Sequence, residues 1–430
     1  MKNRRCGIAR CVLRGLLLMS FFNACSSLQK RPANRANDHA FIAYWPPPEG
    51  SKQLRLAVKD LIDMKGLVTT AGSEYLAKTS PPAAQDAQCL ELARERHVQI
   101  VGKTNLTEFA VTVSGKNKYF GTPRNRPDGK HRFIPGGSSS GAAVAVETGM
   151  ADVAFGTDTG GSIRLPAACC GILGLMTTFG LVPIKGVFPI SPKHLDTVGP
   201  MAKDMTHLVQ GMDLLQRGFA ARYLSAVAAE PSAKDIRIGR LYLDGTDPAI
   251  DKALDDTLDA KRFKVVRLDQ AFKAKWDQAQ KDGKTVALAD AWLNDQKYTD
   301  KDGVSGTTKI VIGQGKLEYT NNYKNALKRQ AAWQHDLRQV FKKVDFIALP
   351  TMQKLPPRFP FLGRNVVFEL LVFDMQNTVA VNFAGNPALA MPIPMPVKGN
   401  TVPITSLQLI GPRLSEAELL NAGRLIESKH

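Results

Sequence analysis

The hydrophobic positions along the chain fall into short apolar runs and longer runs with helical spacing. The short runs, which predict buried strands, lie at 54–58, 98–101, 153–155, 236–239, 346–350 and 406–411. Helical patterns cover 83–96, a segment from near Thr107, 142–148, much of 245–345 and 416–426. Strands that alternate with helices in this way are typical of a layered α/β sheet.

One stretch of small residues, at 136–174, interrupts this pattern with two serine clusters flanked by glycine. They read Gly136-Gly137-Ser138-Ser139-Ser140-Gly141 and Gly156-Thr157-Asp158-Thr159-Gly160-Gly161-Ser162. Glycine permits positive φ and lets a ligand approach the backbone closely. A serine after Gly-Gly, where a strand gives way to a helix, can project its hydroxyl beside backbone N–H groups. Acyl transfer needs this combination of a nucleophile and an oxyanion hole.

Length and composition are those of a large globular protein, but the charge is unusual. The chain has 430 residues, of which 44% are hydrophobic and 22% charged, which allows one large α/β domain or two smaller ones. Its formal net charge of +18 could attract anionic partners. The basic residues are scattered without interleaved aromatic residues, so we predict no nucleic-acid partner.

The N-terminus has the pattern of an export signal. Basic residues up to Arg14 precede a short apolar run at 15–22, which is too short to span a bilayer and suits a signal peptide. The next residues, 22–27, resemble a bacterial lipobox in which Cys25 would be lipidated and become the mature N-terminus; an ordinary secretory signal is the alternative. We predict an export signal at 1–24, a flexible tether at 25–44 and a membrane-anchored lipoprotein of the bacterial cell envelope that faces the periplasm.

The remaining cysteines and the lysines offer few alternative sites. Cys89, Cys169 and Cys170 show no CxxC spacing, and no HExxH motif occurs, so we predict neither a metal site nor a disulfide framework. We interpret Cys169 and Cys170 as buried apolar residues. Lys59 directly follows the first buried strand. A lysine there is ordinarily solvated, but burial would lower its pKa and supply a neutral amine near pH 7. Gly102-Lys103-Thr104 lacks the upstream glycine of a phosphate loop.

Taken together, these segments resemble the amidase signature family of serine hydrolases. The resemblance is carried by the two serine clusters at 136–141 and 156–164, with flanking matches at 58–60, 101–105, 199–200 and 407–411. It implies one α/β domain at 45–430 whose mixed, mostly parallel sheet is sandwiched by helices. Within it we expect a signature core at 45–230, a variable substrate-shaping region at 235–345 and a C-terminal part at 346–430 that completes the sheet.

The resemblance also implies a Ser–Ser–Lys triad without a cofactor. Ser162 corresponds to the nucleophile, Ser138 to a bridging serine on a cis peptide bond, and Lys59 to the general base. The backbone N–H groups of Thr159, Gly160, Gly161 and Ser162 would hold the oxyanion. Lys103 is a rival base, but its sequence context matches a separate structural motif. The implied activity is hydrolysis of a carboxamide or a linear amide bond in a small molecule.

Three departures from the family pattern bear on the shape of the pocket. Ser140 stands where glycine is common, Leu61 where asparagine is frequent, and Met176-Thr177 where Lys-Pro is usual. None of them removes a member of the triad.

Other interpretations of the same residues remain open. Residues 137–141 also fit the G-x-S-x-G nucleophile elbow of α/β-hydrolases with Ser139 as nucleophile, although Pro135-Gly136 rather than a strand precedes it. A glutamine-dependent aminoacyl-tRNA amidotransferase component would suit the positive charge, but an export signal would separate it from tRNA. A non-catalytic lipid-anchored binding protein of the same fold is the third possibility.

Overall fold

The computed structural model describes residues 39–125, 133–230, 232–359, 365–395 and 404–427. The predicted export signal, Cys25 and the tether up to residue 38 lie outside these residues. All described residues belong to one unit, as the single domain predicted from the sequence requires.

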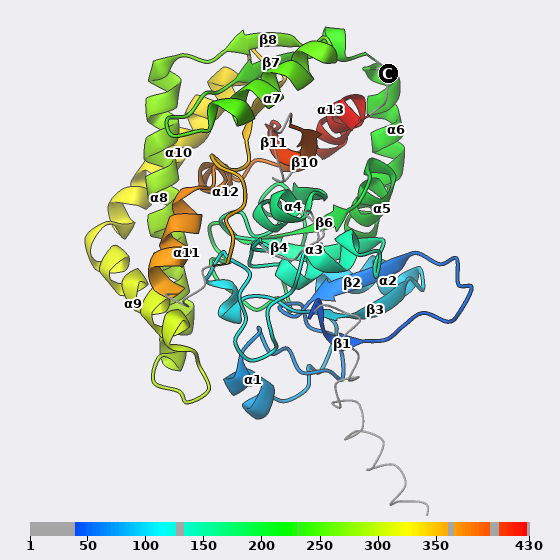
Figure 1. Ribbon diagram of the computed structural model, residues 1–430, viewed down its shortest axis with the longest axis vertical. Helices are drawn as coiled ribbons and strands as arrows, with labels where there is room; N and C mark the ends of the chain where they lie inside the picture. Colours follow the sequence, from blue (N-terminus) through cyan, green and yellow to red (C-terminus); the bar gives the residue numbers. More distant parts are fainter. Residues whose placement is uncertain (1–38, 126–132, 231, 360–364, 396–403, 428–430) are drawn as a thin grey trace, which may run out of the picture. The chain divides into compact units, whose positions relative to one another are not determined.

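A single mixed sheet of eleven strands organises this unit (Figure 1). Its spatial order is β1-β3-β2-β4-β6-β5-β10-β11-β9-β7-β8. The strands are β1 (Phe41–Tyr44), β2 (Arg55–Lys59), β3 (Gln99–Thr104), β4 (Val153–Asp158), β5 (Leu173–Met176), β6 (Thr197–Ala202), β7 (Arg237–Arg240), β8 (Lys264–Arg267), β9 (Phe346–Pro350), β10 (Ala388–Pro394) and β11 (Ile404–Ile410). All six strands predicted from the apolar runs are present.

Strand directions correct one detail of the prediction. The pairs β3–β2, β2–β4, β9–β7 and β7–β8 are parallel, whereas the other six pairs in the described sheet are antiparallel. The α/β class and the mixed sheet are confirmed, but parallel pairing is confined to two flanking groups of strands. Of the central antiparallel pairs, β10 and β11 follow one another directly in the order of strands, so they can pair without a crossover helix.

Helices cover both faces of the sheet. The α-helices are α1 (Glu74–Thr79), α2 (Glu91–Glu95), α3 (Ser140–Glu147), α4 (Arg164–Cys170), α5 (Met205–Leu215), α6 (Phe219–Ala229), α7 (Pro248–Ala260), α8 (Gln270–Asp295), α9 (Gly306–Asn321), α10 (Tyr323–Val340), α11 (Asn365–Asp374), α12 (Val379–Ala384) and α13 (Glu416–Glu427). Short 3-10 helices are η3 (Gln88–Leu90), η4 (Glu108–Ala110), η5 (Ala233–Asp235) and η6 (Gln296–Tyr298). None of the described helices is both long enough and apolar enough to cross a bilayer.

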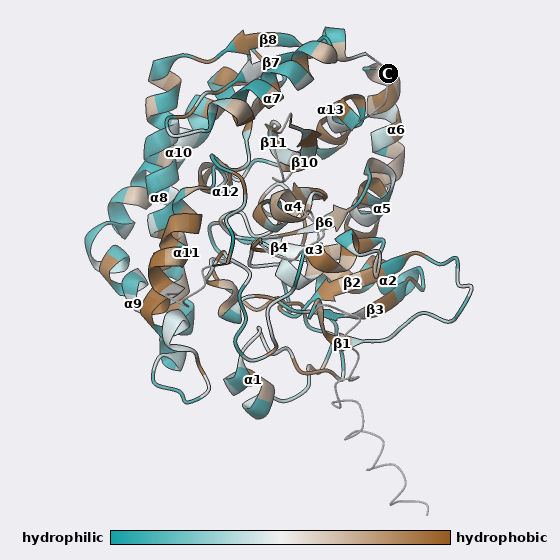
Figure 2. Ribbon diagram, viewed as in Figure 1, coloured by the Kyte–Doolittle hydropathy of each residue, from teal (hydrophilic) through white to brown (hydrophobic). Residues whose placement is uncertain are grey.

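The alternation of side chains along the strands decides which helices pack on which face. Leu56 and Val58 of β2 join the apolar cluster that includes residues of α2, α5, α6, α7 and α13. Ala57, between them, joins the opposite cluster, whose small residues come mainly from α3 and α4. Further along the same face, α8, α10 and α12 pack against β9 and β11. Figure 2 shows largely hydrophilic colours along α8 and α10, whereas α11 is strongly apolar.

The N-terminal limit of the domain lies earlier than the sequence indicated. Residues 41–44, predicted to belong to the tether, form β1 and pair antiparallel with β3. Phe41 packs over Gly102, where a Cβ atom would lie 2.6 Å from its ring, and Ala40 is fully buried. A short edge strand of this kind gives too weak a periodic signal to be detected in the sequence.

Two predicted helices are also shorter than expected. The helix predicted over 83–96 is confined to η3 and α2, because the chain before residue 88 uses its backbone groups in tertiary hydrogen bonds, among them Ala83 N–H to Leu67 O at 2.8 Å. The helix expected near Thr107 is the single turn η4, in which Phe109 has a φ of 51°.

The parallel pairing of β2, β3 and β4 fixes the position of the serine-rich segments. The carboxyl ends of parallel strands meet at one edge of a sheet, and ligands of α/β proteins bind at such edges. Lys59 is the last residue of β2 and Asp158 the last residue of β4. The two serine clusters therefore lie beside Lys59.

Candidate active site

The first serine cluster and Lys59 meet at this edge of the sheet. Lys59 Nζ donates hydrogen bonds to Ser138 Oγ and to Thr157 Oγ1, both at 2.7 Å. Lys59 and Ser138 have no solvent exposure. The Gly137–Ser138 peptide bond is cis. The structure thus brings together two of the three residues that the resemblance assigns to a triad.

Burial changes the protonation of Lys59. Desolvation lowers its pKa to about 7, while the negative charges of Asp158 and Asp196 oppose this shift. Near neutral pH a large fraction of the amine is therefore neutral and has a lone pair that can accept a proton.

Lys103 lies near Lys59 in the fold but has a different environment. It pairs with the buried carboxylate of Asp60 at 2.6 Å, with both side chains almost fully buried. Its Nζ also donates to Thr69 Oγ1 at 3.0 Å. Lys103 is engaged in an ion pair, whereas Lys59 donates a hydrogen bond to the hydroxyl of Ser138, so the geometry favours Lys59 over Lys103 as the base.

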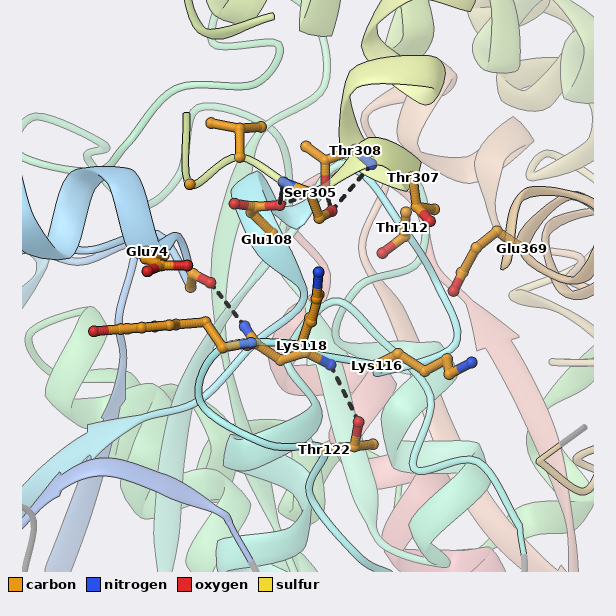
Figure 3. Close-up of a pocket in the computed structure, with 16 residues that line it drawn as sticks. Glu74, Glu108, Thr112, Lys116, Lys118, Thr122, Ser305, Thr307, Thr308 and Glu369 are labelled. Carbon is orange, nitrogen blue, oxygen red and sulfur yellow. Dashed lines mark hydrogen bonds between the residues drawn. The ribbon is translucent and has the colours of Figure 1, made fainter. Parts of the chain in front are cut away.

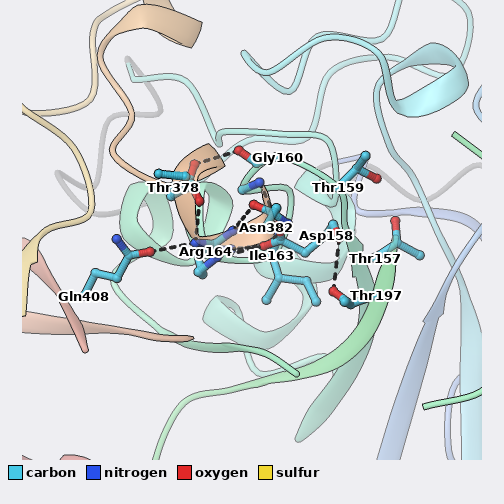
Figure 4. Close-up of polar contacts among 12 residues, drawn as sticks. Thr157, Asp158, Thr159, Gly160, Ile163, Arg164, Thr197, Thr378, Asn382 and Gln408 are labelled. Atoms are coloured by element: carbon cyan, nitrogen blue, oxygen red, sulfur yellow. Dashed lines mark hydrogen bonds and ion pairs between the residues drawn. The ribbon is translucent and has the colours of Figure 1, made fainter. Parts of the chain in front are cut away.

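The second serine cluster forms a turn that is organised around a buried carboxylate (Figure 4). Asp158 accepts from the backbone N–H groups of Gly161 at 2.7 Å and Ile163 at 3.1 Å. It also pairs with the guanidinium of Arg164 at 2.9 Å, and both side chains are fully buried. Although burial raises the pKa of Asp158, the charge and hydrogen bonds of Arg164 outweigh it and hold this pKa below its ordinary value. The carboxylate therefore stays ionised and shapes the turn that carries Ser162.

Residues of the C-terminal part of the chain complete this network. Arg164 Nη1 donates to Thr378 O at 3.0 Å and to Gln408 Oε1 at 2.7 Å. Asn382 Nδ2 donates to Asp158 Oδ1 at 2.8 Å. Thr378 Oγ1 in turn donates to Gly160 O at 2.6 Å. The turn is thus held from two sides, by its own arginine and by a segment more than 200 residues later in the chain.

The oxyanion hole has one backbone N–H donor fewer than the resemblance implied. The N–H of Gly161 is engaged by Asp158, and no described residue accepts a hydrogen bond from the N–H of Thr159, Gly160 or Ser162. Thr159 is anchored by its side chain, which donates to Asp196 Oδ1 at 2.7 Å. Three N–H groups rather than four are therefore available in this turn.

The four serines of the two clusters differ in solvent exposure. Ser162 keeps 7% exposure, whereas Ser138, Ser139 and Ser140 have none. Ser139 Oγ donates to Thr157 O at 3.3 Å. A nucleophile elbow requires a strand directly before the serine, and the described residues 134–138 form none. Of these four hydroxyls, that of Ser162 is the one best placed to meet a substrate.

A polar cavity of about 840 Å³ lies next to the loop that contacts Ser138 (Figure 3). Its wall includes Thr112, whose carbonyl accepts from Thr107 Oγ1 at 2.9 Å, and the N–H of Thr107 donates to Ser138 O at 3.2 Å. Charged residues around the cavity include Glu108, Lys118 and Glu369. Glu108 and Glu369 are nearly buried and are held by hydrogen bonds from the protein itself.

Most residues of the network around the turn were not singled out from the sequence. Asp158 and Arg164 lie inside the signature stretch, so their spacing was a usable signal. Thr378, Asn382 and Gln408 lie far from it, and nothing in their local pattern indicates the contact. At the positions that depart from the family pattern, Leu61 is fully buried and Thr177 Oγ1 donates to Val198 O at 2.9 Å.

The amidase family model matches this chain over residues 54–420. The chain belongs to the amidase family. It is therefore an amidase, an enzyme that acts on carbon–nitrogen bonds.

Known proteins with similar sequences and structures span nearly the whole of this amidase. A glutamyl-tRNA(Gln) amidotransferase subunit of Halobacterium salinarum is 30% identical over 411 residues, which cover 86% of this chain and 94% of that protein. The 2-amino-5-chloromuconic acid deaminase of Comamonas testosteroni is 32% identical over 394 residues, covering 87% and 81%. The crystal structure of the corresponding amidotransferase subunit of Thermotoga maritima superposes with a TM-score of 0.73 at 26% identity, covering 94% of this chain and 90% of that one.

Substitution of Arg164 tests the role of the buried ion pair in this amidase. We expect Arg164→Met to lower the free energy of unfolding by about 3–5 kcal/mol, because it leaves Asp158 buried without a counter-charge. Chemical denaturation followed by circular dichroism measures this change.

The matched control is Arg217→Met, which removes a cation from the exposed pair with Glu95. It should leave the transition unchanged, because exposed pairs contribute little. If both variants unfold at the same denaturant concentration, the ion pair does not have the proposed importance.

Proposed function

We propose that this amidase hydrolyses a carboxamide or linear amide bond through an acyl-enzyme on Ser162. Ser138 acts as the proton relay and Lys59 as the general base. The observation that carries the proposal is the fully buried contact at 2.7 Å between Lys59 Nζ and Ser138 Oγ, beside the turn that presents Ser162.

In the first half-reaction, Ser162 Oγ attacks the carbonyl carbon of the substrate. Its proton passes to Ser138 Oγ while the proton of Ser138 passes to the neutral Nζ of Lys59. The carbonyl oxygen becomes an oxyanion that the N–H groups of Thr159, Gly160 and Ser162 stabilise. Loss of one such donor ordinarily costs about 3–4 kcal/mol of transition-state stabilisation.

The tetrahedral intermediate collapses when the carbon–nitrogen bond breaks. The leaving nitrogen takes a proton back from Lys59 through Ser138, so that the amine departs neutral. Water then attacks the ester on Ser162 while the same relay passes its proton to Lys59. When the bond to Ser162 Oγ breaks, this oxygen takes the proton back from Lys59 through Ser138, and the carboxylic acid leaves. Proton and charge are balanced without any group beyond these residues and water.

A role within a glutamine-dependent amidotransferase is the second candidate. It is favoured by the 30% identity to the protein of Halobacterium salinarum over nearly its full length. The export signal predicted at 1–24 argues against it, because tRNA and ATP are not present outside the cytoplasm. We therefore favour a small-molecule amide as substrate and no nucleic-acid partner.

We further propose that the protein is exported and anchored in the bacterial cell envelope, facing the periplasm, by a lipid on Cys25. The lipobox-like residues 22–27 after a basic and then apolar N-terminus support this proposal. The excess of positive charge would favour an anionic lipid surface.

Active-site labelling tests the catalytic assignment. We expect a fluorophosphonate probe to add once to the full-length protein, at Ser162, because this serine is activated and reachable. Peptide mass spectrometry locates the adduct. Ser162→Ala should abolish it and Lys59→Ala should slow it at least about 100-fold, since the base is lost.

Ser139→Ala is the matched control, because Ser139 is buried and faces the backbone of β4. The Ser139→Ala variant should be labelled at Ser162 to the same extent as the wild type. An adduct on Ser139 would overturn the assignment in favour of a nucleophile elbow, and a folded protein without any adduct would favour a non-catalytic binding protein.

Lipidation is tested in a bacterial host fed with labelled palmitate. The wild type should incorporate the label and sediment with membranes, whereas Cys25→Ala should do neither. Cys11→Ala serves as the control and should behave as the wild type. Absence of label from the wild type would contradict the anchor.

A further inference from the structure

Gln376 has a polar side chain that the protein itself does not satisfy. Its side chain is buried, with the residue 1% exposed, and neither Oε1 nor Nε2 has a hydrogen-bond partner among the described residues. Buried polar side-chain atoms in folded proteins nearly always have such a partner. Two orphaned atoms on one amide therefore require an explanation.

Two other glutamines beside the same segment show the ordinary arrangement. Gln280 of α8 donates through Nε2 to Gln376 O at 2.7 Å and accepts through Oε1 from Ala380 N–H at 2.9 Å. Gln408 of β11 accepts from Arg164 at 2.7 Å and donates to Asn377 O at 2.8 Å. Both amides are paired at each end, which makes Gln376 the exception in this segment.

The unpaired amide lies against the turn that carries Ser162. Its Oε1 would be 2.7 Å from a Cβ atom at Gly161, the residue directly before Ser162. Thr378, two residues later, bonds to Gly160 O at 2.6 Å and fixes this segment on the turn. A substrate acylating Ser162 must occupy space beside the same turn.

An unpaired buried amide destabilises the ligand-free protein. A bound group that forms hydrogen bonds with the amide removes this destabilisation. The side chain has one donor end and one acceptor end, so its best partner is another planar group with both. The terminal torsion of glutamine is broad, so the amide plane can turn toward such a group at little cost. A carboxamide provides the required pair of atoms.

The group recognised by Gln376 is not the amide that is cleaved. The carbonyl oxygen of the scissile amide is needed by the N–H groups of Thr159, Gly160 and Ser162, and its nitrogen must face the relay through Ser138. A carboxamide that pairs at both ends with Gln376 must therefore be a second one on the same substrate.

We propose that Gln376 is a specificity-determining residue that binds a second carboxamide in the acyl part of the substrate. The inference rests on the function proposed above. The preferred substrates are then short linear diamides rather than simple aliphatic amides. Gln376 acts on recognition and does not take part in bond cleavage.

The kinetic test compares a diamide with an apolar analogue of the same shape. Succinamide, glutaramide and adipamide are paired with analogues in which an isopropyl group replaces one carboxamide. We expect kcat/KM of the wild type to favour the best diamide by about 100-fold, since two hydrogen bonds in a buried site are gained. Gln376→Met, which keeps the side-chain size, should reduce this ratio to near one without slowing the analogue.

Gln280→Met is the matched control, because it removes a paired glutamine from the same segment. It should keep the preference for the diamide. The proposal is overturned if Gln376→Met keeps the preference as well, if it slows diamide and analogue equally, or if the wild type shows no preference.

A stability measurement gives a readout that does not depend on activity. Without ligand, Gln376→Met should melt at the same temperature as the wild type or higher, because it removes an unpaired buried amide. Gln280→Met should melt at a lower temperature, because it leaves two backbone groups without partners. A fall in Tm for Gln376→Met as large as that for Gln280→Met would contradict the proposal.

Diamide binding to Ser162→Ala, measured by calorimetry, separates the two proposals. Binding that Gln376→Met abolishes in this background supports the recognition role even if the wild type hydrolyses nothing, in which case only the proposed function fails. Equal binding with and without Gln376→Met would refute the recognition role while leaving the hydrolase assignment intact.

Discussion

The ion pair between Asp158 and Arg164 is the contact on which the rest of the site depends. Both side chains are fully buried, and buried charges are tolerated only when they are paired and their remaining hydrogen-bonding capacity is used. Arg164 meets this requirement by binding Thr378 and Gln408 in addition to Asp158. One arginine thus joins the turn that presents Ser162 to the C-terminal half of the sheet, and the shape of the oxyanion hole follows from that connection.

The buried environment that requires this ion pair also determines the protonation state of Lys59. Removal from water favours the neutral amine, and the pKa of Lys59 falls to about 7 because Asp158 and Asp196 offset only part of the desolvation. The carboxylate of Asp158 contacts Arg164 directly, whereas Lys59 Nζ contacts the hydroxyls of Ser138 and Thr157. Lys103 has a different environment, because it makes a direct ion pair with Asp60 at 2.6 Å. Two buried lysines near one sheet edge therefore differ by whether a carboxylate touches them.

The sequence was most informative where the interactions are local. The serine clusters, the strand before Lys59 and the strand before Ser162 could be predicted because each depends on residues close together in the chain. The short edge strand β1 and the limited extent of helix α2 depend on tertiary pairing, so they could not be predicted from the sequence. Gly161 was expected to bind the oxyanion, yet its N–H is used by Asp158. The partners supplied by Thr378, Asn382 and Gln408, and the unpaired amide of Gln376, become visible only when distant segments are placed side by side.

The proposed mechanism requires Lys59 to be a neutral base at physiological pH. The most direct test is an NMR titration of the lysine side chains in protein labelled with ¹³C-lysine, in which the Lys59 signal is identified by its loss in Lys59→Met. We expect the Lys59 signal to titrate with a midpoint near 7, with the neutral form present above that pH. A midpoint near the ordinary lysine value of about 10.4 would contradict it, because the amine would then be protonated at neutral pH and unable to take the proton from Ser138.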